Sequence, residues 1–231
     1  LPVGALLGLG LARTIASAME SEIFRVPFVV QPASFAFSFL VVLVSARYLT
    51  LDPDVFFPQQ RAVYVANTAA IVGHIVGGML ALLLGPIQFV PAVRRRWPRV
   101  HRALGRGYLV GIVLGGVAGL WMARLAYGGP VAQLGFAALA LFWLTTSFQA
   151  LARIRAGDVD AHRAWMVRSF ALTFAAVMLR LELPLLVGAG LTFEVAYATV
   201  AWACWVPSLL VVELVLTRRR RSAVGRLHAT P

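Results

Sequence analysis

The amino-acid sequence of 231 residues contains little charge, one cysteine and no lysine. Charged residues make up only 13% of the chain and hydrophobic residues 60%, and a soluble domain of this length could not bury that much apolar surface. The one cysteine, Cys204, excludes a disulfide within the chain and a cysteine-based metal site. The chain also lacks a G-x-S-x-G motif, a phosphate-binding glycine loop and a polar domain with paired carboxylates, so nothing in it indicates the catalytic site of a soluble enzyme.

Long apolar runs take the place of charged residues. Each run is close to or above the ~20 residues that cross a bilayer, and within hydrocarbon a helix satisfies its own backbone hydrogen bonds. The sequence therefore predicts an all-α, polytopic transmembrane helical bundle. Its six expected spans cover residues 33–51, 63–90, 104–127, 131–151, 164–187 and 195–216.

The chain divides into three segments by composition. Residues 1–32 form an N-terminal segment whose apolar part is too short to span. It is either the remnant of an earlier span, which would give seven spans in the full-length parent, or a surface helix or processed targeting segment. Residues 33–217 hold the predicted bundle, and residues 218–231 form a basic tail. Short connections make successive helices antiparallel neighbours, so spans two to five are expected to form a four-helix core.

The formal net charge of +12 is concentrated in the connections between alternate spans. Fifteen of the 21 basic residues lie at 94–106, 153–168 and 218–226, after the second, fourth and sixth runs. These stretches therefore share one face of the membrane, and the positive-inside rule predicts that this face is cytoplasmic. We expect a multi-pass protein of the cytoplasmic membrane, with the arginine-rich loops and C-terminus facing anionic lipid headgroups rather than nucleic acid.

A polar stripe runs along the second expected span. Asn67, His74, Ala81 and Gln88 recur every seven residues, which places them on one face of a helix. Polar groups are costly in hydrocarbon, so this face should point into the bundle. Two interpretations stay open: the stripe lines a cavity or cofactor slot, or it is ordinary close helix packing.

Arg180 on the fifth expected span lies roughly 27 Å beyond His162 along the helix, which brings it to the depth of His74. A buried arginine in a membrane should have a partner, and Glu182 or Glu194 is the nearest candidate in sequence. The expected polar intramembrane cluster consists of His74, Arg180, Glu182, Asn67 and Gln88.

Two further patterns concern helix packing. Glycines recur every four residues on the third span and predict a close-packing seam of the small-xxx-small type. They are Gly107, Gly111, Gly115 and Gly119. On the last span, Glu213 lies level with Arg106 or Arg168, so we expect an ion pair there.

The tripeptide His-Arg-Ala occurs twice, where a basic loop meets an apolar run, at His101–Ala103 and His162–Ala164. Two imidazoles at one level could ligate a single haem b iron from opposite faces. Arg102 and Arg163 are among the arginines that could hold its propionates. Two alternatives remain: another transition metal bound with nearby aspartates, or histidines that start helices at the headgroup level, with Asp160 as an N-cap.

Three segments carry a resemblance to a known family: Gly85–Phe89, His101–Tyr108 and His162–Ser169. They resemble a bacterial membrane family catalogued as domain of unknown function 2306, over roughly residues 64–184. The resemblance implies a bacterial membrane protein and brings no established activity.

More distantly, the pattern is similar to the ascorbate-reducible b-type di-haem membrane cytochromes. In that family a histidine stands in a glycine-rich helix and another opens the next helix with a His-x-x-x-Gly pattern, which His101 and Gly105 match here. The resemblance implies haem binding close to these two residues. Those cytochromes use four histidines, whereas this chain has three in or near the bundle, so two bis-histidine haems are excluded.

The resulting hypothesis is a redox subunit that binds one b-type haem through His101 and His162 near the cytoplasmic face. It would exchange electrons with a quinone or a partner protein. The alternative is a cofactor-free structural or accessory subunit of a larger membrane complex, for which the glycine seam and the arginine-rich loops would suffice. A third class is a small-molecule carrier with its site at the level of His74 and Arg180.

Overall fold

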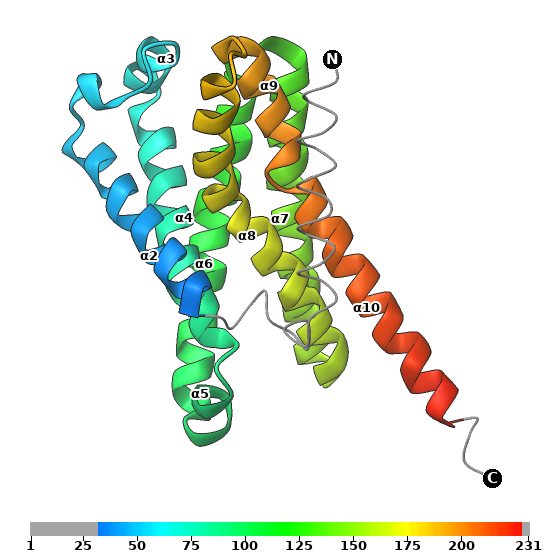
Figure 1. The fold of residues 1–231 in the computed structure, drawn as a ribbon. Helices are drawn as coiled ribbons and strands as arrows, with labels where there is room; N and C mark the ends of the chain where they lie inside the picture. Colours follow the sequence, from blue (N-terminus) through cyan, green and yellow to red (C-terminus); the bar gives the residue numbers. More distant parts are fainter. Residues whose placement is uncertain (1–31, 228–231) are drawn as a thin grey trace.

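The computed structural model describes residues 32–227, and every element within this range is helical (Figure 1). Five helical segments in this part of the chain are long and apolar enough to cross a membrane: Thr68–Gln88, Pro98–Ala123, Gly129–Arg155, Val159–Gly188 and Phe193–Arg218, the last of which takes in two successive helices. The predicted all-helical, multi-pass architecture is confirmed. The expectations for the N-terminal segment up to residue 31, including a truncated span, fall outside the described residues.

Four helices form the core of the bundle, and they correspond to predicted spans two to five. They are α4 (Thr68–Gln88), α6 (Pro98–Ala123), α7 (Gly129–Arg155) and α8 (Val159–Gly188). Helix α4 packs against α6, α6 against α7, α7 against α8, and α8 against α4. Because the ring closes in this order, α6 and α8 occupy diagonal positions, and the side chains that join them reach across the core.

Helices α4 and α6 approach closely, because glycines line their interface. A Cβ atom built on Gly77 of α4 would lie 2.5 Å from the Gly111 oxygen of α6. A Cβ on Gly119 would lie 2.7 Å from Nδ1 of His74. The glycine seam predicted for the third span is confirmed, and its partner is α4.

The first expected span is shorter than predicted. Helix α2 (Pro32–Ala46) is followed by one turn of 3-10 helix, η2 (Arg47–Thr50). Leu51 then adopts a left-handed conformation with a φ of 61°, and Asp52 caps the next short turn, η3 (Pro53–Val55). Helix α2 runs obliquely and packs against α4 and α8 (Figure 1). Five helices, rather than the six expected, have the length of a full span within the described residues.

The second expected span is broken near its start. It divides at Asn67 into α3 (Arg61–Ala66) and α4. The Asn67 side chain donates from Nδ2 to the Val63 oxygen at 3.0 Å. Asparagine commonly interrupts helices in this way, because its amide competes for nearby backbone groups.

The last expected span is also broken. Helix α9 (Phe193–Ala203) ends before α10 (Val206–Leu227) begins. Pro207 accounts for the break, because its ring has no N–H with which to continue the hydrogen bonds of α9. Helix α10 extends to Leu227, so it includes the part of the expected basic tail from residue 218 to residue 227.

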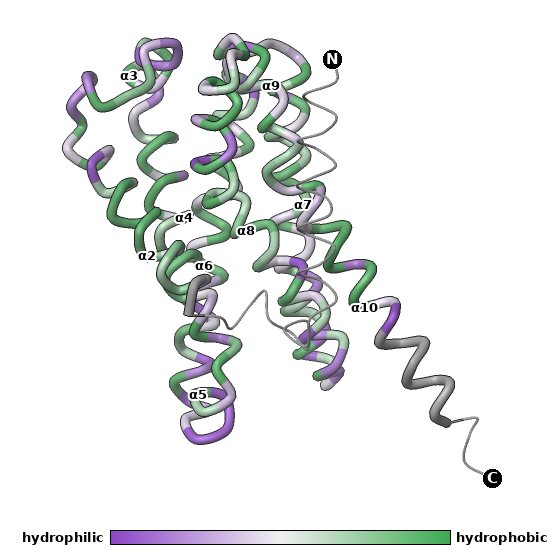
Figure 2. The backbone as a smooth tube through the Cα atoms, in the orientation of Figure 1, coloured by the Kyte–Doolittle hydropathy of each residue, from purple (hydrophilic) through white to green (hydrophobic). Residues whose placement is uncertain are grey.

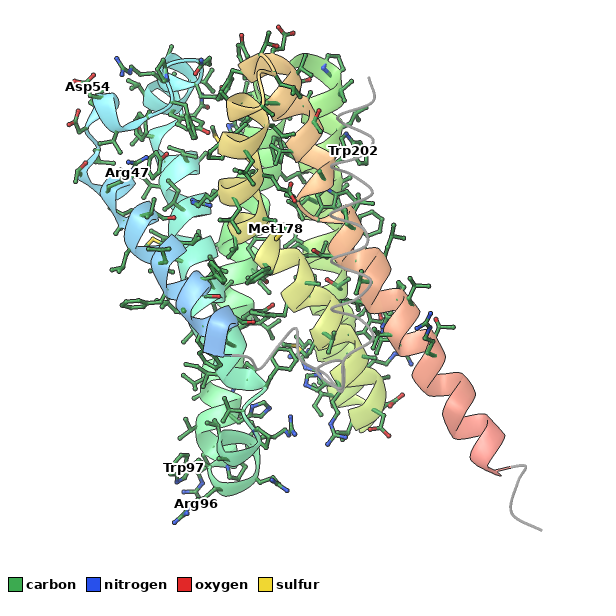
Figure 3. All side chains as sticks on the ribbon, in the orientation of Figure 1. Arg47, Asp54, Arg96, Trp97, Met178 and Trp202 are labelled. Carbon is green, nitrogen blue, oxygen red and sulfur yellow. The ribbon has the colours of Figure 1, made fainter. Side chains whose placement is uncertain are left out.

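The arginine-rich stretches lie toward one end of the bundle. Helix α5 (Pro91–Arg96), the connection between α7 and α8, and the far part of α10 all lie toward the bottom of Figure 1. Figure 2 shows hydrophobic residues along the middle of the bundle and most hydrophilic residues toward the helix ends. In Figure 3, Arg96 and Trp97 mark this arginine-rich end, and Arg47 and Asp54 lie toward the opposite, distal end. The arrangement agrees with the predicted gathering of arginines on one membrane face.

Candidate functional site

A cavity of about 760 Å³ lies within the bundle and is lined by residues of α2, α4, α6, α7, α8 and α9. This volume is within the range of small-molecule sites in proteins. Most of the wall is apolar, and α2 contributes Phe37, Leu40, Val41 and Val44. The polar lining includes Arg47, Tyr48, Gln60, Tyr64, His74, Arg180 and Tyr197. The structure therefore places two members of the predicted polar cluster, His74 and Arg180, on one cavity.

His74 of α4 is held against the backbone of α6. Its Nδ1 donates to the Gly115 oxygen at 2.8 Å, so the neutral ring keeps Nε2 as an acceptor. Gly119 leaves the space that the ring occupies, because a Cβ there would collide with it. The glycine seam therefore has a second role, which is to position this histidine.

Arg180 of α8 is held by two neutral acceptors. Nη1 donates to the Ala176 oxygen at 2.9 Å, and Nη2 donates to Ser45 Oγ of α2 at 2.8 Å. Ser45 Oγ donates in turn to the Val41 oxygen at 2.6 Å, which leaves its lone pairs for the arginine. These contacts tie the short helix α2 to the core at the level of the cavity.

Our prediction that Arg180 has an acidic partner is wrong. Neither Glu182 nor Glu194 forms an ion pair with Arg180 within the described part of the chain. Two positions along a helix correspond to a rotation of about 200°, so Glu182 leaves α8 on a different face. Its Oε2 is buried without a hydrogen-bond partner among the described residues, and Glu194 is exposed in the first turn of α9.

Three tyrosines, Tyr48, Tyr64 and Tyr197, gather with Arg180 at the polar end of the cavity. Burial, and next the neighbouring Tyr197, raise the pKa of the Tyr64 phenol well above its usual value. Tyr64 is therefore neutral at physiological pH and presents a hydroxyl rather than a charge. The polar end of the cavity combines neutral hydroxyls with the positive charges of Arg180 and Arg47.

Asn67 and Gln88, also predicted in the cluster, lie elsewhere. Asn67 Oδ1 accepts from Trp121 Nε1 at 3.1 Å. Gln88 contacts His101 at the arginine-rich end. With its amide oriented to satisfy its neighbours, Gln88 Nε2 donates to the oxygen and Nδ1 of His101 at 3.2 and 3.0 Å, and Oε1 accepts from the Gly105 N–H at 3.3 Å. The predicted cluster therefore divides, because its stripe extends along the whole of α4, or about 31 Å.

His101 of α6 and His162 of α8 lie near the arginine-rich end. Tyr108 of α6 and Ser169 of α8 join these helices through a hydrogen bond of 2.8 Å. His101 lies seven residues before Tyr108, and His162 lies seven residues before Ser169, which is about 10 Å along each helix. The two histidines therefore lie at a common level, close enough for the charge of one to act on the other. His162 Nδ1 donates to the Ala150 oxygen of α7 at 2.8 Å.

The charged residues predicted around these histidines have other partners or face outward. Arg163 donates to Asp160 at 3.1 Å on the surface, and Arg102 is exposed. Asp158, rather than the expected Asp160, caps α8, because it directly precedes the first helical residue and accepts from the Ala161 N–H at 2.9 Å. Within the described residues, no three His, Cys, Asp or Glu side chains gather to hold a metal ion.

The ion pair expected for Glu213 is formed with Arg168. Arg168 Nη2 donates to Glu213 Oε2 at 2.8 Å, and Nε donates to Oε1. The guanidinium also lies 4.7 Å from the centre of the Trp165 ring. This two-pronged contact joins α8 to α10 and commits Arg168 to a structural role.

A buried hydrogen-bond network lies between the cavity and the histidines. The Tyr108 hydroxyl contacts Ser169 Oγ at 2.8 Å and Thr173 Oγ1 at 2.9 Å. Trp143 Nε1 donates to Thr173 Oγ1 at 2.8 Å, and Ser147 Oγ contacts Ser169 Oγ at 2.7 Å. The network joins α6, α7 and α8, and its members Trp143 and Thr173 also line the cavity.

Sequence reasoning missed the tyrosines and the glutamine of the cavity. Tyr48 and Gln60 come from the region before the predicted core, Tyr64 from the start of the second expected span, and Tyr197 from the last span. The available signal was a hydroxyl inside or beside an apolar run, which by itself does not say which helices meet. The network around Tyr108 had a stronger signal, because Tyr108 and Ser169 stand at the same spacing from the two His-Arg-Ala tripeptides.

Comparison with known proteins agrees with the membrane assignment. A family model described as "Predicted membrane protein (DUF2306)" matches residues 71–216, which is more than half of the chain and includes His74, His101, His162 and Arg180. No curated protein and no solved structure matches the chain. The distant similarity to b-type di-haem cytochromes receives no support from these comparisons. The chain belongs to the DUF2306 family of predicted membrane proteins.

Proposed function

We propose that this membrane protein binds an amphipathic small molecule in the cavity of its helical bundle. The observation that carries the proposal is a cavity of about 760 Å³ whose wall joins apolar residues of α2 to His74 and Arg180. Polar and charged side chains are costly within a membrane bundle, and there they mark ligand sites and pathways. This arrangement supports the third hypothesis from the sequence, a carrier site at the level of His74 and Arg180, better than the other two.

Each part of the lining has a role in such binding. The face of α2 from Phe37 to Val44 offers apolar contact. His74, held by the Gly115 oxygen, presents Nε2 as an acceptor. Arg180 presents donors, and the neutral Tyr64 hydroxyl adds a polar group beside it. The combination of an apolar wall with a few convergent polar groups is typical of sites that orient a small molecule.

Gly78 allows a direct test, because it lines the cavity and a Cβ built on it has no neighbour within 4 Å. Gly78→Phe should therefore fill the cavity without displacing the backbone. Gly188→Phe is the matched control, since Gly188 is equally unobstructed but exposed and outside the cavity lining.

The measurement is mass spectrometry of solvent extracts from the wild type and both variants, each purified in nanodiscs of zwitterionic lipid. The wild type and Gly188→Phe should retain an amphipathic species that empty nanodiscs lack, and Gly78→Phe should lose it. A wild-type extract indistinguishable from that of empty nanodiscs would contradict the proposal.

A second candidate, the redox subunit with one b-type haem, is favoured by one contact. His162 Nδ1 donates to the Ala150 oxygen, which orients the ring as metal-binding histidines are oriented, with Nε2 as its acceptor. His101 is held differently, because Gln88 donates to its Nδ1 and the neutral ring then carries its proton on Nε2. Nε2 of His101 could ligate iron only if that proton moved to Nδ1, which accepts from Gln88, so the two rings do not fit haem equally well.

The haem candidate is tested by the absorption spectrum of protein purified with added haem precursor. A split alpha band on dithionite reduction, lost in His162→Ala, would support haem binding, on which electron exchange with a quinone or partner protein would depend. A wild-type spectrum without haem absorbance would exclude it. If both ligand tests are negative, the accessory-subunit role is favoured, and replacing His101 and His162 with alanine should leave complex assembly unchanged.

The charge distribution supports a cytoplasmic location for the arginine-rich end, where it would face anionic lipid headgroups of the bacterial inner membrane.

A further inference from the structure

We infer that the molecule bound in the cavity carries an anionic head, and that Arg180 supplies its counter-charge. The inference rests on the proposed function and names the chemical class of the ligand. Its basis is the contrast between the charge of Arg180 and the neutral groups that accept its hydrogen bonds.

Arg180 is a charged side chain where charge is costly. A guanidinium stays protonated at physiological pH, and a buried charge in a membrane bundle requires an opposite charge or a polar partner. Its two acceptors, the Ala176 carbonyl and the Ser45 hydroxyl, are both neutral. No carboxylate pairs with it anywhere in the part of the chain that the structure describes. An anion in the adjoining cavity would complete this site.

The donors of Arg180 suit a carboxylate or phosphate. A guanidinium has five N–H groups, of which the contacts to Ala176 and Ser45 use two. The remaining donors lie in one plane, and this geometry favours paired hydrogen bonds to two oxygens of an anion. The Ser45 hydroxyl does not donate to the anion in place of Arg180, because its proton is already donated to the Val41 oxygen. Tyr64 adds a neutral hydroxyl at the same end of the cavity.

The apolar wall indicates an extended hydrophobic body behind this head. The cavity-lining residues extend from Arg47 of η2, at the distal end, back along α2 to Phe37, a distance of about 15 Å. A chain lying along this face would point from Arg180 toward the arginine-rich end. A fatty-acid-like carboxylate and an anionic phospholipid share this chemistry of an anionic head on an apolar chain.

The experiment compares two probes that differ only in their heads. Saturable binding of radiolabelled laurate and of radiolabelled dodecanol is measured with wild-type protein in zwitterionic nanodiscs, after subtraction of empty nanodiscs. Laurate should bind about tenfold more tightly or better, because a charge-assisted hydrogen bond contributes about 1.5–3 kcal/mol and 1.4 kcal/mol corresponds to tenfold.

Three variants assign the preference to one side chain. Arg180→Gln should lose the preference for laurate over dodecanol, and Arg180→Lys, which keeps the charge, should retain a large part of this preference. Arg124→Gln is the matched control and should behave as wild type, because Arg124 is exposed, lies over the Trp121 ring at 3.9 Å and does not line the cavity.

The outcomes separate this inference from the proposed function. Equal binding of laurate and dodecanol by the wild type would overturn the anionic head and leave the amphipathic site standing, and this result does not depend on whether a variant folds. A preference for laurate that persists in folded Arg180→Gln would overturn the role of Arg180. Saturable binding of neither probe, with no molecule extracted from the wild type, would overturn the proposed function itself.

If laurate binds, its displacement by phosphatidylglycerol in the nanodisc assigns the ligand to the lipid source, and undiminished binding assigns it to a free carboxylate.

Discussion

Gly77 of α4 lies directly against the backbone of Gly115 of α6. A Cβ on Gly77 would lie 2.6 Å from the Gly115 Cα and 2.5 Å from the Gly111 oxygen, and these backbone atoms cannot rotate away as a side chain can. Gly77→Ala should therefore force α4 and α6 apart and lower the free energy of unfolding by about 1–3 kcal/mol. The thermal unfolding midpoint of the purified protein in detergent measures this effect.

The adjacent Gly78 provides the control for that prediction. A Cβ at Gly78 would have no neighbour within 4 Å, so Gly78→Ala should unfold close to the wild-type temperature. The two substitutions make the same chemical change on the same helix. Equal destabilisation of both variants would show that the contact with α6 is not the cause.

Tyr108→Phe tests the hydrogen bonds that join α6 to α8 across the core. The phenol contacts Ser169 and Thr173 at 2.8 and 2.9 Å, and its removal should cost about 1 kcal/mol of stability. The cost is modest because Ser169 keeps Ser147 as a partner and Thr173 keeps Trp143. Chemical unfolding in mixed micelles measures the change.

Tyr127→Phe is the matched control for Tyr108→Phe. Tyr127 contacts Phe193 through its ring, with centroids 5.7 Å apart, and this contact survives loss of the hydroxyl. The free energy of unfolding of Tyr127→Phe should stay within error of the wild-type value. A Tyr108→Phe protein as stable as Tyr127→Phe would mean that the buried network does not hold the diagonal helices together.

The ion pair between Arg168 and Glu213 should contribute measurably to the attachment of α10. The Arg168 side chain is 12% exposed and that of Glu213 44%, so Glu213→Gln leaves a largely buried guanidinium without its counter-charge. We expect a loss of about 1–3 kcal/mol. A double-mutant cycle with Arg168→Gln should give a coupling energy of about 1 kcal/mol, and additive losses would count against a direct interaction.

Membrane orientation can be tested with introduced cysteines, because the native Cys204 is buried. Asp54→Cys lies at the distal end and Arg96→Cys at the arginine-rich end (Figure 3). If the arginine-rich end is cytoplasmic, a membrane-impermeant maleimide should label Asp54→Cys in intact spheroplasts and Arg96→Cys only in inverted vesicles. The reverse pattern would invert the assigned topology.

The polar stripe of α4 illustrates how far sequence periodicity can be carried. Its seven-residue spacing correctly predicted one face directed into the bundle, because a helix repeats nearly every seven residues whatever surrounds it. His74 on that face meets α6 at Gly115, and Gln88 meets α6 at His101. One part of this face lines the cavity and another part packs closely against α6. The seven-residue spacing is the same in both parts, so periodicity does not distinguish a cavity wall from a packing surface.

Arg180 illustrates the opposite case. Its depth in the bundle followed from counting residues along one helix, but its partner did not. Ser45 lies 135 residues away in sequence, on a helix that was expected to flank the core. The nearer Glu182 was a poor guide, because two residues along a helix point in different directions.

Hydropathy and the backbone's need for internal hydrogen bonds were sufficient to establish a helical membrane protein with its arginines toward one end, since both act locally along the chain. The cavity, the neutral acceptors of Arg180 and the link between Tyr108 and Ser169 required the packed bundle. These features join helices that are distant in sequence, and the side chains that meet depend on helix breaks, crossings and glycine contacts that no local pattern specifies.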